Sequence, residues 1–362
     1  MTEQRISVSI SGVLIVFAAI AAAIIGWQLR GLLLLVMISV VLACSIAPIV
    51  NWAERYRIPR WLGALLTYLA IIGTLVGVVL LIGPTVLEQI QLLVRQLPLL
   101  LRKAVTQIEG WVLLLNDSRP DFTTQIFDQL DVQGIAAWAI RSIRQVALRS
   151  FNLTTDILGT LLSLILAVFI SGYMLADSQT LVTNFVRLIP APWDQRVNEH
   201  LPEVSERIGT YIRGRIIVSG TLALITSIGL SFLGLQDFAI GLGAIAGVTN
   251  LIPFLGPILG AIPALLVAIP LGGWSVLWIV IFYAILQNIE TYLLDPLLVG
   301  SSVGVHPLYQ LLAVLGGAQL LGIIGALIVP PWVAGSAVLV ENLYLQPKLK
   351  TEKHIEQQAS TV

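Results

Sequence analysis

The sequence predicts an all-α polytopic membrane protein with about seven to eight transmembrane helices, one of them broken and re-entrant-like, plus an extramembrane helical arm. Three observations predict this class. Hydrophobic residues make up 57% of the 362 positions. Charged residues make up only 11%, against about 25% in a typical soluble domain. Several apolar runs approach the roughly 20 residues with which a helix crosses a bilayer.

The first 83 residues predict three membrane spans. Apolar runs at Val8–Ile25 and Gly31–Val50 follow each other almost directly, so we expect a retained helical hairpin rather than a cleaved signal peptide. A third run covers Trp61–Ile82. The single cysteine, Cys44, lies in the second run, which excludes an intrachain disulfide and a Cys-cluster zinc site.

Residues 84–153 predict the extramembrane arm. Charges of both signs alternate with apolar residues there, and apolar side chains recur every three or four positions, as in an amphipathic helix. We expect this helix to pack against its own chain or a sister subunit; the alternative is a helix lying on membrane lipid. The stripe consists of Leu87, Ile90, Val94, Leu97, Leu101, Val105, Ile108 and Val112.

The distribution of basic residues predicts the orientation. Residues 154–176 form a fourth apolar run and residues 177–213 a second polar segment. By the positive-inside rule, the loop after the second span and the tail at residues 347–362 lie in the cytoplasm. Both termini and residues 177–213 are then cytoplasmic, in a multi-pass protein of the cell inner (plasma) membrane. The basic residues concerned are Arg55, Arg57, Arg60, Lys348, Lys350 and Lys353.

Residues 214–346 predict a core with broken helices. Prolines interrupt the apolar stretch between Gly241 and Pro270, and proline removes a backbone hydrogen bond that hydrocarbon cannot replace. Unwound segments of this kind form binding sites in secondary transporters. Asn250 precedes the break and offers both a donor and an acceptor. The alternative is a short extramembrane loop between two ordinary spans. The hinge residues are Pro253, Gly256, Pro257 and Pro263.

Acidic residues without basic neighbours mark a second candidate feature. No Lys or Arg lies between Arg215 and Lys348, yet Glu290 and Asp295 lie between two apolar runs there. A charge at bilayer depth costs about 2.5–3.5 kcal/mol, so it usually faces a bundle interior or a wet cavity. A buried carboxylate without a cationic neighbour can bind a proton or a sodium-sized cation near neutral pH.

The same segment predicts a polar helix face. If residues 287–294 are helical, Gln287, Glu290 and Thr291 share one side. Together with Asn250 and Asp295 they are the expected substrate- or ion-binding residues. The alternative is an interfacial loop whose acids are solvated. His306 is a candidate proton relay, although such a histidine often hydrogen-bonds a nearby backbone group instead.

Several function classes find no support. The sequence contains no GxxxxGK(S/T) phosphate loop, GxSxG elbow or HExxH helix, so we expect no enzyme and no cofactor, metal or catalytic site. Lys and Arg number 20, as do Asp and Glu, so no net basic charge indicates nucleic acid as a partner.

An ordered set of motifs resembles the autoinducer-2 exporter family of permeases. The set is Tyr211-Ile212-Arg213-Gly214, Asn250 with Pro253 and Gly256-Pro257, Gln287 with Glu290, His306-Pro307, and Gly322 with Gly325-Ala326. The similarity is sharp over residues 211–335 and more diffuse elsewhere. The chain departs from the family pattern at Arg215, where relatives commonly have Gln.

The resemblance implies a homo-oligomeric transporter, with members linked either to export of autoinducer-2 or to sodium/proton exchange. The family's broken-helix motif falls on Asn250, Pro253, Gly256 and Pro257, and its polar-helix motif on Gln287 and Glu290. We therefore expect a secondary transporter that moves a small polar solute. Protons and sodium are the two candidate coupling ions. A sodium(lithium)/proton antiporter that carries a monovalent cation is the first alternative, and a non-transporting membrane scaffold is the second.

Overall fold

The structure, a computed structural model, describes residues 28–118, 154–300 and 306–359, together with a few positions between 17 and 26. Within these residues the chain forms helices and no strand, which confirms the all-α class. Five helices are long and apolar enough to cross a membrane, or six if one bent pair counts as a single span. Most of Val8–Ile25 and residues 119–153 lie outside the described residues, so the number of seven to eight spans stays a prediction.

Helices α2 (Arg30–Arg55), α3 (Arg60–Ser118) and α6 (Thr154–Ala176) pack together beside the core. Helix α6 has the bounds predicted for the fourth span. Tyr68 of α3 is buried between α2 and α6, and its hydroxyl group hydrogen-bonds that of Ser171. A polar group so placed in an apolar interface needs this partner, because lipid offers none.

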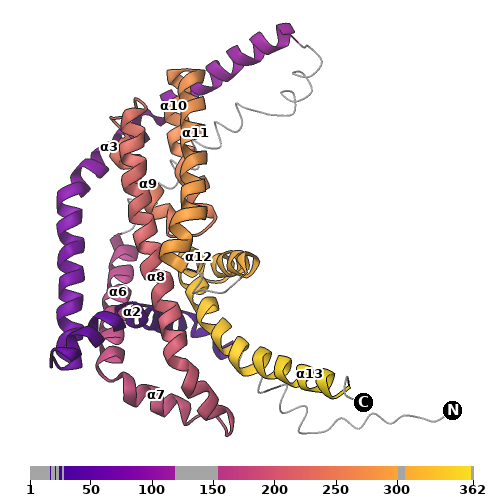
Figure 1. The fold of residues 1–362 in the computed structure, drawn as a ribbon. Helices are drawn as coiled ribbons and strands as arrows, with labels where there is room; N and C mark the ends of the chain where they lie inside the picture. Colours follow the sequence, from indigo (N-terminus) through magenta and orange to yellow (C-terminus); the bar gives the residue numbers. More distant parts are fainter. Residues whose placement is uncertain are drawn as a thin grey trace.

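Helix α3 carries the third predicted span and the start of the arm without a break. Figure 1 shows it rising along one side of the molecule and bending over the top of α9–α11. Pro84 and Pro98 lie inside it and each removes a helical hydrogen bond, which accounts for bending. Leu97 and Leu101 of the predicted stripe are buried, whereas Leu87 and Val94 are exposed. The arm therefore packs on its own chain through only part of the predicted stripe.

Helix α8 (Trp193–Phe232) is the central element and follows the short α7 (Ser178–Val186). Its 40 residues span about 60 Å, so one continuous helix joins the polar segment to the apolar core. It contacts α2, α9, α12 and η2. Its buried face includes Tyr211, Arg215, Ser219, Leu222 and Thr226.

A proline in α2 explains how α8 is attached to it. Pro48 has no N–H, so the carbonyl oxygen of Cys44 lacks its helical donor. Arg213 of α8 supplies one: its Nη1 lies 3.4 Å from that oxygen and 2.9 Å from the carbonyl oxygen of Ser45. Gly209 allows this approach, because an added Cβ would lie 2.3 Å from the Cys44 oxygen. Arg213 thus satisfies backbone groups that lipid could not.

The predicted break is present between α9 (Ala239–Asn250) and α10 (Leu255–Ala268). The two helices have 12 and 14 residues, too few to span about 30 Å each. They pack against each other as a hairpin, and Phe254 in the turn has φ 65°. Two short paired helices fit the re-entrant expectation better than two ordinary spans. The chain continues through η1 (Ile269–Leu271), α11 (Gly273–Ile289) and the π-helix η2 (Glu290–Gly300).

Helix α12 (Pro307–Val340) is folded double at Gly322, whose φ is 70°. A Cβ added to Gly317 would lie 2.4 Å from the carbonyl oxygen of Gly325, although residues eight apart in a straight helix are separated by about 12 Å. Glycine at both positions lets the two backbones touch. The chain ends with η4 (Glu341–Leu345) and α13 (Gln346–Ala359), which projects away from the helices in Figure 1.

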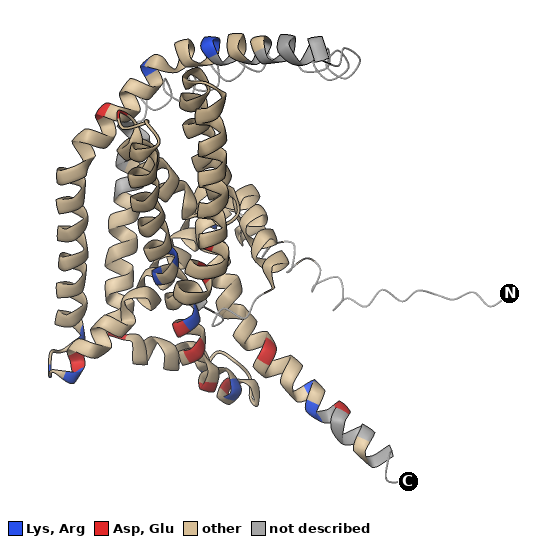
Figure 2. Cartoon of the chain, turned by 45° about the horizontal axis from the view of Figure 1, so that its top comes forward, with Lys and Arg blue, Asp and Glu red and all other residues tan. Residues whose placement is uncertain are grey.

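Charged residues gather in three regions of the molecule. Figure 2 shows the first at the lower end, where it includes the loop between α2 and α3, the corner between α7 and α8, and α13. Others lie on the upper part of α3, and a small group lies among uncharged helices in the middle. The two basic segments thus lie at one end, as the positive-inside argument requires, and the assignment of that end to the cytoplasm stays a prediction.

The fold of α12 generates a stability prediction with an adjacent control. Gly317→Ala places a Cβ against the Gly325 backbone and should lower the free energy of unfolding by about 1–3 kcal/mol. Gly316→Ala meets no atom within 4 Å and should raise it by about 0.5–1 kcal/mol, because glycine is unfavourable inside a helix. Thermal unfolding of the detergent-purified variants checks this. Equal midpoints for the two variants would argue against the folded form of α12.

Candidate functional site

The break between α9 and α10 brings Asn250 into the protein interior. Its side chain is at the end of α9 and only 2% of the residue is exposed. The Thr249 hydroxyl lies 3.1 Å from the carbonyl oxygen of Gly256 and so connects the two helices across the turn. Gly256 is required by the close packing, because an added Cβ would lie 2.4 Å from the Asn250 Cα. The hairpin therefore holds Asn250 in a fixed position against α8.

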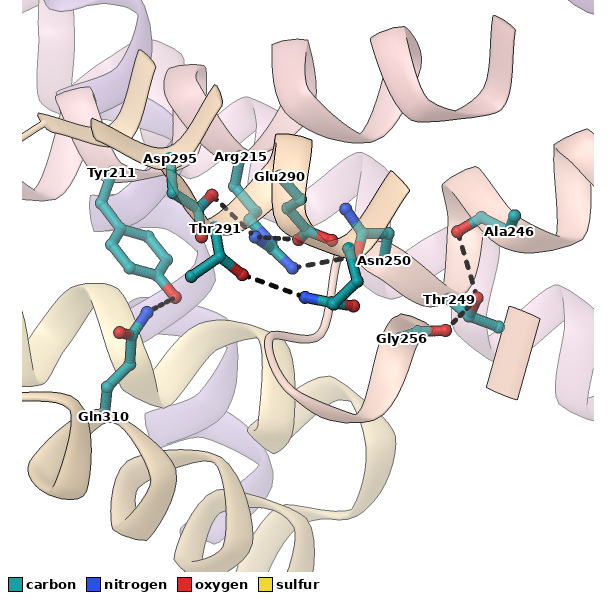
Figure 3. Close-up of polar contacts among 11 residues, drawn as sticks. Tyr211, Arg215, Ala246, Thr249, Asn250, Gly256, Glu290, Thr291, Asp295 and Gln310 are labelled. Carbon is teal, nitrogen blue, oxygen red and sulfur yellow. Dashed lines mark hydrogen bonds and ion pairs between the residues drawn. The ribbon is translucent and has the colours of Figure 1, made fainter. Parts of the chain in front are cut away.

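An arginine from α8 meets Asn250 and both predicted acids (Figure 3). Nη1 of Arg215 lies 3.1 Å from Oε1 of Glu290 and 3.3 Å from Oδ1 of Asp295. Its Nη2 donates to Oδ1 of Asn250 at 3.2 Å. The side chains of Arg215 and Glu290 are 4% and 5% exposed, whereas that of Asp295 is 41% exposed. We call Arg215, Asn250, Glu290 and Asp295 the polar cluster.

The π-helical geometry of η2 aligns the two acids. Glu290 and Asp295 are five residues apart, and a π-helix closes its hydrogen bonds at that spacing. In an α-helix they would point roughly 140° apart. Pro296 follows Asp295 and has no N–H to donate to an α-helical ladder. The change of helix type thus lets one guanidinium contact both carboxylates.

The environment of Glu290 differs from the one expected. Its segment has no basic neighbour along the chain, but Arg215 of α8 is in direct contact with it. A buried charge without a partner would be strongly unfavourable, and the ion pair removes most of that cost. With both carboxylates ionised, the polar cluster holds one positive and two negative charges. It therefore retains one negative charge that a proton or another cation could balance.

Gln287 and Thr291 lie beside the polar cluster and do not belong to it. Both residues are exposed, and Nε2 of Gln287 donates to the Thr291 hydroxyl at 3.2 Å. Glu290 turns inward from them. The expected common face of Gln287, Glu290 and Thr291 therefore divides into an exposed pair and a buried acid, because η2 departs from α-helical geometry after Ile289.

A cavity of about 370 Å³ adjoins the polar cluster. It is bounded by α8, α9, α10 and α11, and its walls are mainly apolar. Two buried polar atoms, Nδ2 of Asn250 and Oγ1 of Thr226, have no hydrogen-bond partner among the described residues. Buried groups of this kind usually have one, so they could bind water or a guest in the cavity. The polar lining residues are Thr226, Asn250, Tyr283, Gln287 and Glu290.

The remaining predicted residues shape the helix break or cap a helix. Pro253 lies buried in the turn, Pro257 lines the cavity and Pro263 lies within α10. His306 caps α12, where its Nδ1 accepts a hydrogen bond from the backbone N–H of Leu308 at 3.2 Å. This is the backbone interaction considered as the alternative to a proton relay. Within the described residues, no group of three His, Cys, Asp or Glu side chains could hold a metal ion.

A further polar contact joins α8 to α12 next to the polar cluster. Tyr211 lies one turn before Arg215 on α8, and its hydroxyl accepts a hydrogen bond from Nε2 of Gln310 at 3.1 Å. Neither Arg215 nor Tyr211 was among the predicted site residues. The signal that could have found Arg215 was its position as the last basic residue before the charge-free core, together with its departure from the family pattern.

Comparison with known proteins gives a consistent family assignment. The family model described as "AI-2E family transporter" matches residues 13–345. The "Putative transport protein YrrI" of Bacillus subtilis is 30% identical over 314 residues, which cover 84% of each chain. "Putative transport protein YueF" of the same species is 26% identical over 86% of this chain and 84% of its own. "Putative transport protein sll0063" of Synechocystis is 26% identical over 91% of this chain and 81% of its own.

The ion pair predicts that removing the arginine and removing the glutamate destabilise the protein by different amounts. Arg215→Ala leaves two carboxylates without a cation and should destabilise the protein by about 3–5 kcal/mol. Glu290→Ala should cost less, because Asp295 still balances Arg215. The double variant should be less destabilised than the sum of the two, by about 0.5–3 kcal/mol. Lower pH should reduce the loss of stability caused by Arg215→Ala, since the two carboxylates can then take up protons.

Thermal unfolding in detergent at several pH values measures all three variants. The ion pair would be contradicted if the double variant lost as much stability as the two single variants together. It would also be contradicted if the stability loss of Arg215→Ala grew as the pH falls.

Proposed function

The chain belongs to the AI-2E family of transporters, and we propose that it is a secondary transporter that moves a small polar solute, with Glu290 binding a coupling proton. The observation that supports this most is the position of Glu290, which is buried, paired with Arg215 and in the lining of the cavity. A charge placed inside apolar helices at such a cost is usually functional.

The helix break supports a role in binding. Asn250 and Gln287 are proposed to hydrogen-bond the guest, because both line the cavity and Nδ2 of Asn250 has no partner among the described residues. Pro253, Gly256 and Pro257 would shape the tip of the α9–α10 hairpin. Short helices that end inside a membrane protein present unpaired backbone and side-chain groups to a substrate.

A sodium(lithium)/proton antiporter is the second candidate. It is favoured by the excess of one carboxylate over the guanidinium in the polar cluster. Arg215 weighs against a metal cation, because it already contacts an oxygen of each neighbouring polar side chain. A non-transporting scaffold is a weaker reading, since a scaffold has no need for a buried acid beside a cavity.

Solute transport is tested first with autoinducer-2 as the test solute, the solute linked to members of the autoinducer-2 exporter family. We expect proteoliposomes to accumulate it when a pH gradient is imposed, and Glu290→Gln to reduce uptake to background, because the amide cannot bind the coupling proton. Asp237→Asn is the control: Asp237 is an exposed acid between α8 and α9 and should be dispensable. Equal uptake by the wild type and Glu290→Gln would remove Glu290 from the mechanism.

The antiporter reading is tested in vesicles that hold a pH-sensitive dye. Sodium, lithium or potassium is added outside, and the solute-transporter proposal expects no cation-driven proton movement. Proton movement that is lost in Glu290→Gln and kept in Asp237→Asn would instead establish the antiporter.

A further inference from the structure

Arg215 lies among side-chain oxygen atoms of the kind that coordinate cations. Its guanidinium contacts one oxygen from each of three side chains: Oε1 of Glu290 at 3.1 Å, Oδ1 of Asp295 at 3.3 Å and Oδ1 of Asn250 at 3.2 Å. These are the anionic and amide oxygens that meet at the helix break. Coupling ions in carriers are coordinated by such groups at interrupted helices, so a sodium ion would have to compete with Arg215 for them.

We propose that Arg215 is a tethered counterion that makes the coupling site selective for protons over sodium, an inference that rests on the proposed role of Glu290. A proton needs a single carboxylate oxygen, whereas sodium needs several oxygen ligands at once. A sodium ion bound to Glu290 would also lie beside a guanidinium of the same charge, in surroundings that screen it poorly. Such a repulsive element is a common source of specificity.

The charges of the polar cluster fit exchange with one proton. With Glu290 and Asp295 both ionised, the three charged side chains sum to one negative charge. A hydronium ion transfers its proton to a Glu290 carboxylate oxygen and becomes water, the ion pair with Arg215 ends, and the cluster becomes neutral. The guanidinium keeps its contacts with Asp295 and Asn250. No other bond changes, so binding of one proton to Glu290 replaces its ion pair with Arg215.

Burial assigns the proton to Glu290. The side chain of Asp295 is 41% exposed and that of Glu290 only 5%, so water stabilises the charged form of Asp295 more. The groups facing Glu290 are Arg215 from α8, Asn250 from α9 and Asp295 from η2. Tyr283 of α11 shares the cavity, and its hydroxyl donates to the carbonyl oxygen of Gly260. Within the described residues, Arg215 is the cation at ion-pair distance from Glu290.

Sodium binding is the direct test and needs no transport. Radiolabelled sodium is titrated onto the purified protein in detergent at several pH values. We expect no saturable binding by the wild type over the titrated range, and saturable binding by Arg215→Gln with a dissociation constant at least about tenfold below the highest sodium concentration used. Adding Glu290→Gln to that variant should abolish the binding. Arg207→Gln is the control, because Arg207 is also on α8 but contacts Glu203 and Glu341 instead.

Two results would overturn the proposal. One is saturable sodium binding by the wild type that Glu290→Gln abolishes. The other is the absence of sodium binding in an Arg215→Gln protein that unfolds at the same temperature as the wild type. If Arg215→Gln does not fold, the comparison of the wild type with Glu290→Gln decides alone. Failure of the proposed function would appear separately, as the absence of solute uptake in vesicles, whatever the sodium titration gives.

Discussion

The ion pair between Arg215 and Glu290 constrains how the helices of the C-terminal half of the protein pack. Both side chains lie among apolar helices, where an unpaired charge would cost several kcal/mol. Three elements must therefore meet: α8 brings the cation, η2 brings the acids, and the end of α9 brings the Asn250 amide. Gly214 shows how tightly they meet, since a Cβ there would lie 2.2 Å from the carbonyl oxygen of Leu298.

Interrupted helices make this meeting possible. The turn before Leu255 exposes the end of α9, the π-helix brings Glu290 and Asp295 to one side, and the fold at Gly322 turns α12 back on itself. Each interruption occurs where the sequence removes a donor or a side chain, at Pro253, Pro296 and Gly322. In lipid such interruptions persist only where protein or water satisfies the freed groups. The cavity beside the polar cluster is therefore expected to be wet and accessible to a guest.

Much of this architecture could be predicted from residue patterns, and the failures have two causes: a contact made by tertiary packing and a local change of helix type. Apolar length predicted α6, and the prolines predicted the break after Asn250, because both are properties of neighbouring residues. The partner of Glu290 could not be predicted in this way, because the sequence separation from Arg215 hides a contact that only tertiary packing creates. The face shared by Gln287, Glu290 and Thr291 assumed α-helical spacing, which ends at Ile289.

Water access to the polar cluster separates a transport site from a structural ion pair. Gln287 is exposed and lines the cavity beside Glu290, so Gln287→Cys in a Cys44→Ala background gives a single thiol at this position. A membrane-impermeant maleimide is added to one side of sealed vesicles, and then to the other. The account predicts labelling from both sides, since a carrier opens its site to each side in turn. Labelling from one side only, or from neither, would contradict it.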